Sequence, residues 1–268
     1  MKQALTIAGS DSGGGAGIQA DIKTIEANGV FATSVITAVT AQNTVEVRDA
    51  VDLPLDIIRC QMDAVFDDFD IAAAKTGMLS STGVIETVCD VLVRRAFTQL
   101  VVDPVMISKS GYRLLKDEAI DCIKSRLLPL ALVATPNLHE ASLLAGFPIR
   151  SNEEMREAAE AIGGMGPRNV VVKGGHSAWS RGVDVFFDGR ECRQLDPLAV
   201  YDRSVHGTGC TFSAAITARL ALGEPLLEAV RNAKRYTTQV IAHQLEIGHG
   251  YGPGHHFYFI SPEDAAKD

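Results

Sequence analysis

Two short segments of the chain carry residue types suited to holding phosphate. Lys173 leaves the apolar run 170–172 and enters a Gly-Gly turn, a placement that a surface lysine does not need. An ammonium group there is a point charge well suited to a phosphate. The segment 206–211 opens an amphipathic helical pattern, and its small residues would expose backbone N–H groups at a helix N-terminus; these residues are Gly207, Thr208 and Gly209. The two segments predict an anion site made of backbone amides and one lysine.

Cys210 follows these glycines and would lie in the first turn of the predicted helix. A thiol at a helix N-terminus is expected to have a lowered pKa, which suits a base or a nucleophile. The plainer interpretation is a buried cysteine beside a glycine-rich cap. A Cys210–His206 nucleophile pair is a further alternative, since the two residues are four positions apart across a glycine turn.

Two carboxylates follow predicted strands and are candidates for a metal site. Asp103 begins an Asp-Pro step directly after the apolar residues 100–102, and an acid there can hold a metal ion or orient a substrate. Glu140 comes three residues after Asn137, which is a good helix N-cap. The plainer interpretations are a turn for Asp103 and a favourable helix-dipole contact for Glu140. The functional interpretation is magnesium, bound directly or through water.

Further candidates for ligand contact have less distinctive patterns. The glycine-rich segment 9–17 follows the first predicted strand and is either a plain β–α turn or a ligand-contacting loop. It lacks the Gly-x-Gly-x-x-Gly spacing, and the chain has no Walker A string, which excludes a P-loop. The Gln42 side chain both donates and accepts, so it can read the edge of an amide-like heterocycle. Met78 either packs on a flat ring or fills core. Three histidines fit no metal template and predict a solvated loop: His249, His255 and His256.

The apolar pattern predicts the scaffold that positions these residues. Short apolar runs favour strands at 4–8, 30–39, 71–74, 100–102, 130–134 and 170–172. Helical spacing favours helices over 18–25, 55–65, 85–92, 120–127, 152–162, 212–220 and 226–240. This alternation predicts an α/β fold with a mostly parallel central sheet and helices on both faces, in one domain spanning 1–268. Such sheets bind ligands outside the carboxyl ends of their strands.

Composition and charge indicate which kinds of binding partner and which cellular compartment to expect. Of the 268 residues, 46% are hydrophobic and 22% charged, and the net charge is 25 − 33 = −8. An acidic chain without a basic run is a poor partner for nucleic acid or an anionic membrane. The five cysteines form no Cys-x-x-Cys pair, and no stretch reaches the roughly 18 apolar residues of a membrane span. With no signal-peptide pattern, these features predict a cytoplasmic protein with reduced thiols.

The motifs in their order resemble a known family. They are Gly9-Ser10-Asp11-Ser12-Gly13-Gly14-Gly15-Ala16-Gly17, Thr40-Ala41-Gln42-Asn43, Lys75-Thr76-Gly77-Met78-Leu79, Asp103-Pro104-Val105-Met106, Asn137-Leu138-His139-Glu140, Lys173-Gly174-Gly175-His176 and His206-Gly207-Thr208-Gly209-Cys210-Thr211. This series, with the glycine-rich tail at 248–254, resembles the hydroxymethylpyrimidine/phosphomethylpyrimidine kinases of thiamine biosynthesis, within the ribokinase-like superfamily. Most ribokinase-like enzymes end the last motif in Asp. Cys210 therefore points to the pyrimidine branch and its pyridoxal-kinase-active relatives.

The resemblance implies a ribokinase-like three-layer sandwich without the separate lid domain of sugar kinases, and a homodimer. It implies ATP-dependent phosphorylation of 4-amino-5-hydroxymethyl-2-methylpyrimidine and then of its monophosphate to the diphosphate. By the same resemblance, Asp21 and Gln42 would bind the aminopyrimidine. The residues packing on its ring would be Ala16, Met78 and Val105.

For the nucleotide, the resemblance implies that Lys173 holds ATP phosphates, with Asn137 and Thr208 as further contacts. Asp103 and Glu140 would organise Mg²⁺. Cys210, beside the amides of Gly207, Thr208 and Gly209, would stand where other members place the base that takes the hydroxymethyl proton.

One departure and three alternatives accompany this interpretation. The family usually has Asn-Thr-His before the glycines, whereas this chain has Ser204-Val205-His206 and lacks the threonine hydroxyl near the nucleotide. A pyridoxal or pyridoxine kinase on the same fold is the nearest alternative. A non-catalytic pyrimidine-binding protein is another, although it would not need Lys173, Glu140 and Cys210 together. An NAD-dependent oxidoreductase is disfavoured because the dinucleotide fingerprint is missing.

Overall fold

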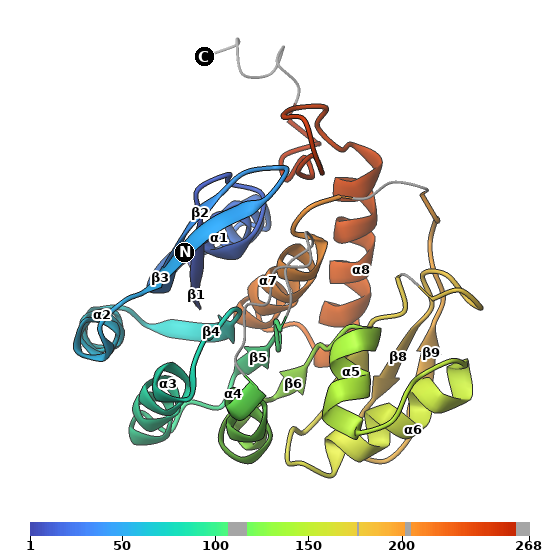
Figure 1. The fold of residues 1–268 in the computed structure, drawn as a ribbon, viewed down its shortest axis with the longest axis horizontal. Coiled ribbons are helices and arrows are strands. Elements are labelled where there is room, and N and C mark those ends of the chain that lie inside the picture. Colours follow the sequence, from blue (N-terminus) through green and yellow to red (C-terminus); the bar gives the residue numbers. More distant parts are fainter. Residues whose placement is uncertain (107–116, 176, 202–204, 261–268) are drawn as a thin grey trace.

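The computed structural model describes residues 1–106, 117–175, 177–201 and 205–260. Its described part contains one nine-stranded sheet in the order β3-β2-β1-β4-β5-β6-β7-β8-β9 (Figure 1). The strands are β1 (Gln3–Asp11), β2 (Phe31–Gln42), β3 (Val47–Asp52), β4 (Ile71–Thr76), β5 (Leu100–Val102), β6 (Val133–Ala134), β7 (Val170–Val172), β8 (Asp184–Phe187) and β9 (Cys192–Leu195). From β2 to β7 neighbouring strands are parallel, whereas β3, β8 and β9 pair antiparallel at the edges. The predicted α/β fold with a mostly parallel sheet is confirmed.

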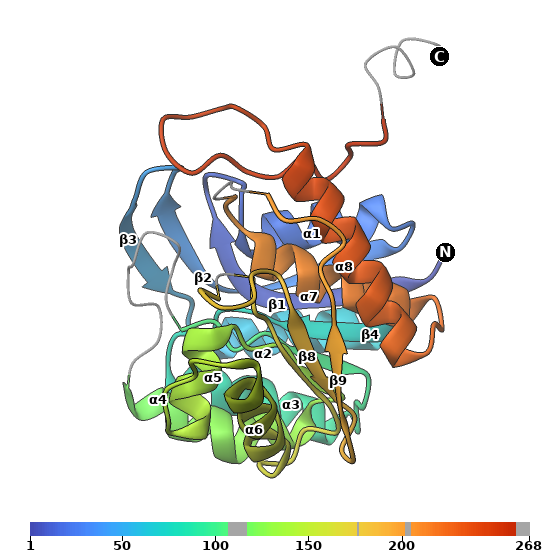
Figure 2. The same cartoon turned by 90° about the vertical axis from the view of Figure 1, so that its right-hand side faces the viewer.

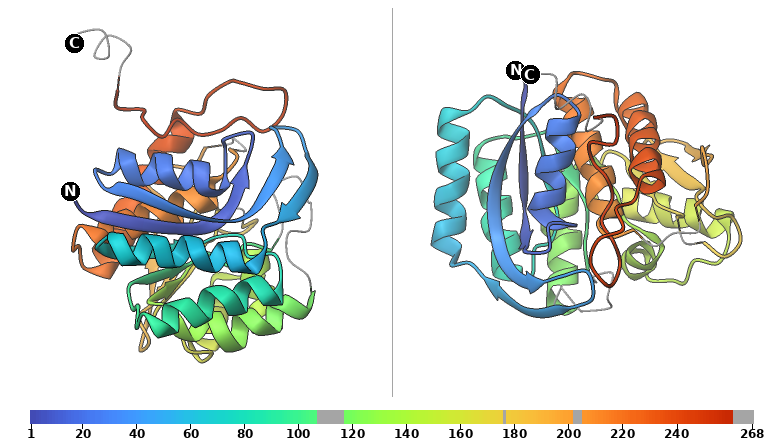
Figure 3. Two further views of the ribbon diagram at one scale, coloured as in Figure 1. Left: turned by 90° about the vertical axis from the view of Figure 1, so that its left-hand side faces the viewer. Right: turned by 90° about the horizontal axis from the view of Figure 1, so that it is seen from above.

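Helices cover both faces of the sheet, which gives three layers (Figures 1 and 3). On one face lie α2 (Leu55–Asp68), α3 (Thr82–Arg94), α4 (Asp117–Cys122), α5 (Leu138–Ala145) and α6 (Asn152–Gly163). On the other face lie α1 (Gly17–Ala27), α7 (Thr208–Ala221) and α8 (Leu226–Ala242). A π-helical turn (Ile123–Leu127) and a 3-10 turn (Leu128–Leu130) follow α4 directly.

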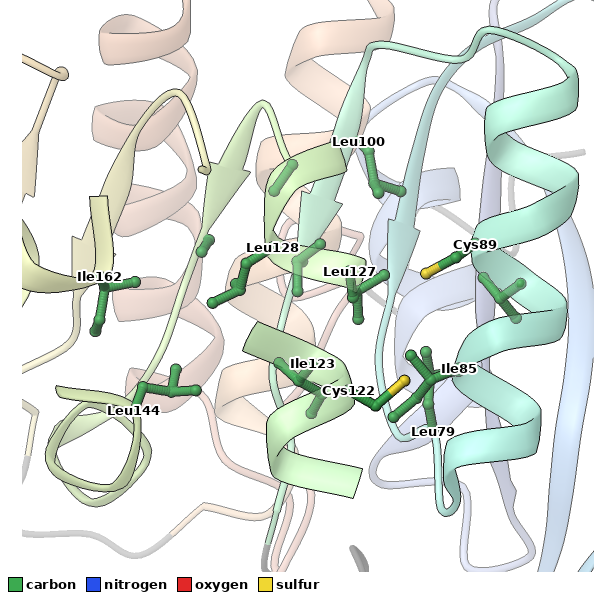
Figure 4. Packing of buried hydrophobic residues seen from close by; sticks show 14 of the residues in the cluster. Leu79, Ile85, Cys89, Leu100, Cys122, Ile123, Leu127, Leu128, Leu144 and Ile162 are labelled. Atoms are coloured by element: carbon green, nitrogen blue, oxygen red, sulfur yellow. The ribbon is translucent and has the colours of Figure 1, made fainter. Parts of the chain in front are cut away.

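The apolar strands are buried on both faces because successive side chains point to opposite sides of a sheet. In β5, Leu100 and Val102 pack into the layer formed by α2 to α6, while Val101 packs against α7 and α8. Figure 4 shows the first of these layers, where Ile85 of α3 and Cys122 of α4 lie near each other beneath the strands. Short runs of three apolar residues therefore bind both helical layers to one sheet.

Most predicted elements occur with small differences at their ends, and the strands predicted at 100–102 and 170–172 have the predicted bounds. The strand predicted over 130–134 is wrong in its first half, since Leu128–Leu130 forms a 3-10 turn that contains Pro129 and only Val133–Ala134 forms a strand of the sheet. The sequence analysis does not predict β3, β8 or β9. In β3 four of the six residues are exposed, so this edge strand lacks an apolar pattern.

The sheet contains all the described strands, so the described part of the chain has no separate lid sheet. None of the described helices combines the length and the apolar character that a membrane crossing requires. At the far edge, α8 lies beside β8, as Figure 2 shows, and the Lys234 ammonium on α8 donates to the Asp184 carboxylate at 2.5 Å. This contact holds the last helix against the β8–β9 hairpin.

Candidate active site

A cavity of about 790 Å³ opens at the carboxyl ends of the strands. The chain runs from β1 outward to β2 and β3 and then returns to β4 on the other side of β1. That reversal makes a topological switch point, where ligands of open α/β sheets bind. The predicted site residues that line the cavity are Ala16, Gln42, Met78, Asp103, Val105, Asn137, Glu140, Lys173, Gly207, Thr208, Gly209 and Cys210.

The glycine-rich loop after β1 folds around the Asp11 carboxylate. Its two oxygens accept hydrogen bonds from the backbone N–H groups of Gly13, Gly15 and Ala16 at 2.8–3.0 Å. Burial alone raises the pKa of Asp11, but hydrogen bonds from His206, Gly13 and Ala16 outweigh burial and bring the pKa below its ordinary value. The carboxylate therefore organises a loop that lines the cavity.

Helix α7 begins against this loop at a position that only glycine fits. Gly207 has φ +75°, a conformation that side chains disfavour, and a Cβ there would overlap the carbonyl oxygen of Gly15. Thr208, Gly209 and Cys210 form the first helical turn, and the first N–H groups of a helix have no acceptor within the helix. The close approach places the first turn of α7 at the wall of the cavity; that its backbone N–H groups hold an anion stays a prediction.

Lys173 extends toward the same helix end from β7. Its ammonium donates to the Asp103 carboxylate at 2.9 Å, and a Cβ on Gly209 would lie 3.4 Å from the same ammonium nitrogen. Asp103 also accepts from the hydroxyls of Thr135 and Ser213. Burial alone raises the pKa of Asp103, but the lysine charges outweigh it and hold the pKa below its ordinary value. A cation, a carboxylate and the start of α7 therefore meet at one point.

Glu140 lies in the first turn of α5 and is buried. The predicted N-cap is confirmed: Asn137 accepts from the Glu140 N–H at 2.9 Å, and the Glu140 carboxylate accepts from the Asn137 N–H at 2.8 Å. Burial raises the pKa of Glu140 to about 7, since the Asp103 carboxylate adds to burial and the Lys173 ammonium only partly opposes it. The group therefore caps its helix and also titrates near neutral pH.

The environment of Cys210 reverses the expectation of a lowered thiol pKa. Desolvation raises its pKa to about 12; Lys75 and the Gly17 N–H oppose this rise, while the carboxylates of Asp21 and Asp103 add to it. The helix N-terminus is thus outweighed by burial among acidic groups. The alternative Cys210–His206 pair is not formed, because the His206 ring contacts Asp11 and Gln42 instead.

Another part of the cavity wall carries the residues predicted to contact a flat ring. Met78, Val105 and Ala16 line it together with the Gln42 amide. Gly9 lies directly against Met78, since a Cβ there would come so close to the methionine methyl group that the end of the Met78 side chain would have to shift. Asp21, predicted as a substrate contact, does not line this cavity.

The structure corrects the predicted role of Asp21 as a substrate contact. Its side chain is fully buried, with the Lys75 ammonium at 2.8 Å and the Thr6 hydroxyl at 2.6 Å. A carboxylate closed off in this way cannot reach a ligand directly; it lies behind the cavity wall and neutralises Lys75. Sequence analysis missed Lys75, although a lysine at the end of a small-residue strand is the signal that singled out Lys173.

The predicted solvated loop is confirmed around His249, where residues 246–251 are exposed, but it is wrong for the following residues, which pack onto the site. The His206 N–H donates to the Gly252 carbonyl, and the Tyr251 N–H donates to the Thr44 carbonyl after β2. His256 is buried, with its ring 3.2 Å from the Thr211 hydroxyl, while His249 is exposed. Ser204, part of the departure from the family pattern, lies outside the described residues; Val205 is buried and lines the cavity.

The residues present fit a magnesium ion only with help from a ligand. The described part of the chain has no group of three or more His, Cys, Asp or Glu side chains that could hold a metal. Asp103 and Glu140 nonetheless line one cavity. Mg²⁺ is commonly held by one or two carboxylates, substrate phosphates and water. These two carboxylates suit that arrangement.

One cavity at the carboxyl ends of a mostly parallel sheet is lined by the start of a helix, a lysine, two carboxylates and apolar side chains. This arrangement fits a small-molecule kinase of the ribokinase-like class. The phosphomethylpyrimidine kinase family matches residues 11–255. The chain belongs to this family.

Two relatives share the name hydroxymethylpyrimidine/phosphomethylpyrimidine kinase. The protein from Haemophilus influenzae is 49% identical over 97% of this chain and 98% of its own length. The protein from Rhizobium meliloti is 52% identical over 95% of this chain and 97% of its own length.

Solved structures agree with this assignment. An ADP complex of Bacillus subtilis pyridoxal kinase has a TM-score of 0.90 and 37% identity, covering 97% of this chain and 98% of that one. Phosphomethylpyrimidine kinase from Clostridium difficile 630 has a TM-score of 0.81 and 44% identity, covering 90% of this chain and 100% of that one.

We predict that Glu140 makes stability depend on pH. Its pKa rises from an ordinary 4.5 to about 7 on folding, so the folded protein binds the proton more tightly. The resulting stabilisation is complete below about 4.5 and is lost as pH rises through about 7. Thermal unfolding of ligand-free protein should show this loss in the wild type and not in Glu140→Gln, whose amide oxygen still caps the helix. The exposed Glu157→Gln variant should behave as wild type, and equal pH dependence in all three would contradict the prediction.

Proposed function

We propose that the chain uses ATP to phosphorylate the hydroxymethyl group of 4-amino-5-hydroxymethyl-2-methylpyrimidine, and then the monophosphate to give the diphosphate. One observation carries this proposal. The segment 206–210 joins the two parts of the cavity, since His206 contacts Gln42 at one end and Gly209 lies beside Lys173 at the other. A ring held at Gln42 therefore has its substituents directed along α7 toward the anion site.

The charged residues suit phosphoryl transfer, which depends on positioning and charge neutralisation more than on covalent chemistry. Lys173 and the backbone amides from Gly207 to Gly209 would hold ATP phosphates, with Thr208 and Asn137 beside them. Asp103 and Glu140 would hold Mg²⁺, which neutralises phosphate charge when bound. Each backbone donor to developing charge contributes roughly 3 kcal/mol, by analogy with oxyanion holes.

Cys210 would accept the hydroxymethyl proton, but its contribution as a base is modest. With a pKa near 12, the thiol is almost wholly protonated at neutral pH. The Lys75 ammonium behind it favours the thiolate, so a small reactive fraction is available. The anion site and Lys173 therefore carry most of the rate.

A second candidate is pyridoxal phosphorylation at the same site. The likeness to pyridoxal kinase favours it, at a TM-score of 0.90. Pyridoxal is also a flat nitrogen ring with a hydroxymethyl group, but it lacks the 4-amino group that Gln42 would read.

We further propose that the whole chain acts as one kinase domain in the cytoplasm. Its strands form a single sheet within the described residues, and all five cysteines are unpaired, as a reducing compartment requires.

Mass analysis of products tests the proposed function. The protein is mixed with ATP, magnesium and hydroxymethylpyrimidine, and a parallel tube holds pyridoxal. We expect monophosphate and then diphosphate of the pyrimidine, with at most slow product from pyridoxal. Phosphorylated pyridoxal alone would transfer the assignment to the second candidate. No product in either tube would contradict both.

We predict that Cys210→Ala lowers turnover about 100-fold, the low end of general base catalysis, while ATP affinity stays near wild type. Steady-state kinetics and nucleotide titration measure the two quantities. Cys192→Ala is the matched control, since Cys192 is also a half-buried thiol with a raised pKa but lies on β9 outside the cavity. Undiminished turnover in Cys210→Ala would remove the thiol from the mechanism.

We propose that two copies associate through β3 and α2. β3 is the terminal strand of the sheet, so its outer edge has no partner strand among the described residues. Val51, Leu55 and Ile57 expose 63%, 41% and 46% of their surface there. Light scattering should give the mass of two chains, and Val51→Asp should reduce it to one. Val93→Asp, at an equally exposed site on α3, should remain dimeric; a monomeric wild type would refute the proposal.

A further inference from the structure

We propose that His206, held by Asp11, fixes the orientation of the Gln42 amide and so makes the site select a 4-aminopyrimidine edge over one with the reverse hydrogen-bonding pattern. The inference rests on the proposed function and deepens it. His206 is a positioning residue here: it acts on the substrate through Gln42.

The geometry gives one ring nitrogen two neighbours. His206 Nε2 lies 3.2 Å from Asp11 Oδ2 and 3.0 Å from Gln42 Nε2. A carboxylate oxygen only accepts, and an amide NH₂ only donates. The ring nitrogen can satisfy one of these contacts as they stand, since it either carries a proton or presents a lone pair.

Asp11 determines whether His206 Nε2 carries a proton or presents a lone pair. Its carboxylate already accepts from the N–H groups of Gly13, Gly15 and Ala16, and these hydrogen bonds favour the ionised form. A lone pair on His206 Nε2 would face this anion at 3.2 Å and repel it. His206 therefore carries its proton on Nε2 and donates it to Asp11.

The proton on His206 Nε2 determines the orientation of the Gln42 side-chain amide. An NH₂ group facing an N–H is repulsive, so the amide turns to present its oxygen to His206. Its NH₂ group then donates to the Thr40 hydroxyl, which now lies 3.2 Å from the other end of the amide, and that hydroxyl donates to the Ser10 carbonyl at 3.0 Å. In this arrangement the single Nε2–H of His206 is shared between the Asp11 and Gln42 oxygens, and the Gln42 NH₂ group donates to Thr40. With the opposite tautomer a lone pair on Nε2 would face the Asp11 carboxylate.

The main chain and the ring of His206 are held separately. The backbone N–H of His206 donates to the Gly252 carbonyl, and the ring lies against Gly15, where an added Cβ would come within 2.6 Å of it. Gln42 lines the cavity, so its fixed amide presents one N–H direction and one oxygen direction to a ligand. A 4-aminopyrimidine supplies a ring-nitrogen acceptor and an amino donor; a 4-oxo ring supplies the reverse.

The experiment compares two substrates on three proteins. The substrates are hydroxymethylpyrimidine and its 4-oxo analogue, and the proteins are wild type, His206→Phe and His206→Gln. Phe keeps the ring volume against Gly15 but loses the N–H. Gln retains an N–H that reaches Asp11.

In His206→Phe we expect the ratio of kcat/KM for the amino over the oxo substrate to fall at least about tenfold, the size of one hydrogen bond of about 1.4 kcal/mol. The change should lie mainly in KM for the pyrimidine, with KM for ATP unchanged. His206→Gln should restore most of the ratio. An unchanged ratio in His206→Phe, with both substrates lowered equally, would show a merely structural role and overturn the inference.

A second measurement does not depend on the His206→Phe variant. ¹⁵N NMR of wild-type protein, with the His206 signal assigned by its absence in His206→Gln, should show a protonated Nε2. The opposite tautomer would overturn the inference even if His206→Phe does not fold. A wild type inactive on both pyrimidines would instead refute the proposed function, and the tautomer measurement would still test the hydrogen-bond network.

Discussion

The site depends on the contact between Gly207 and the carbonyl group of Gly15. Because a side chain at either glycine would collide with its neighbours, the start of α7 lies directly against the loop that follows β1. This contact sets the position of His206 next to Gln42 and of Gly209 next to Lys173. The proposed ring-binding end and the proposed anion-binding end are thereby joined by the five consecutive residues 206–210, and their separation cannot change without unpacking the loop from the helix.

Near this contact, two lysines are each paired with a buried carboxylate. Lys75 is paired with Asp21 behind the cavity, and Lys173 is paired with Asp103 at its wall. Burying a charge is costly unless it is paired, so each lysine needs its carboxylate for stability as well as for any role in binding. Glu140 has no lysine of its own at hydrogen-bond distance within the described residues, and its pKa accordingly rises. Cys210 keeps its proton mainly because burial desolvates the thiol, and the carboxylates of Asp21 and Asp103 raise its pKa further.

Local pattern was enough to predict the framework and most of the cavity. Buried parallel strands are short apolar runs, and the polar or glycine residues after them must lie at the carboxyl edge, which is why Lys173, Asp103 and Glu140 could be identified. The edge strands β3 and β9 could not, because exposure removes the apolar pattern on which such a prediction rests. Asn137 and Glu140 were predictable as a helix cap because the two residues are only three positions apart in the sequence.

The sequence by itself determined the order of strands and helices, the position of the glycines, and the chemical types available at each strand end, since these follow from periodicity and from residues a few positions apart. Tertiary structure alone decided which groups meet. Asp21 is paired with Lys75 across 54 positions, and His206 meets Asp11 across 195. The state of Cys210 was decided in the same way, because a pKa depends on burial and on charges brought from distant strands.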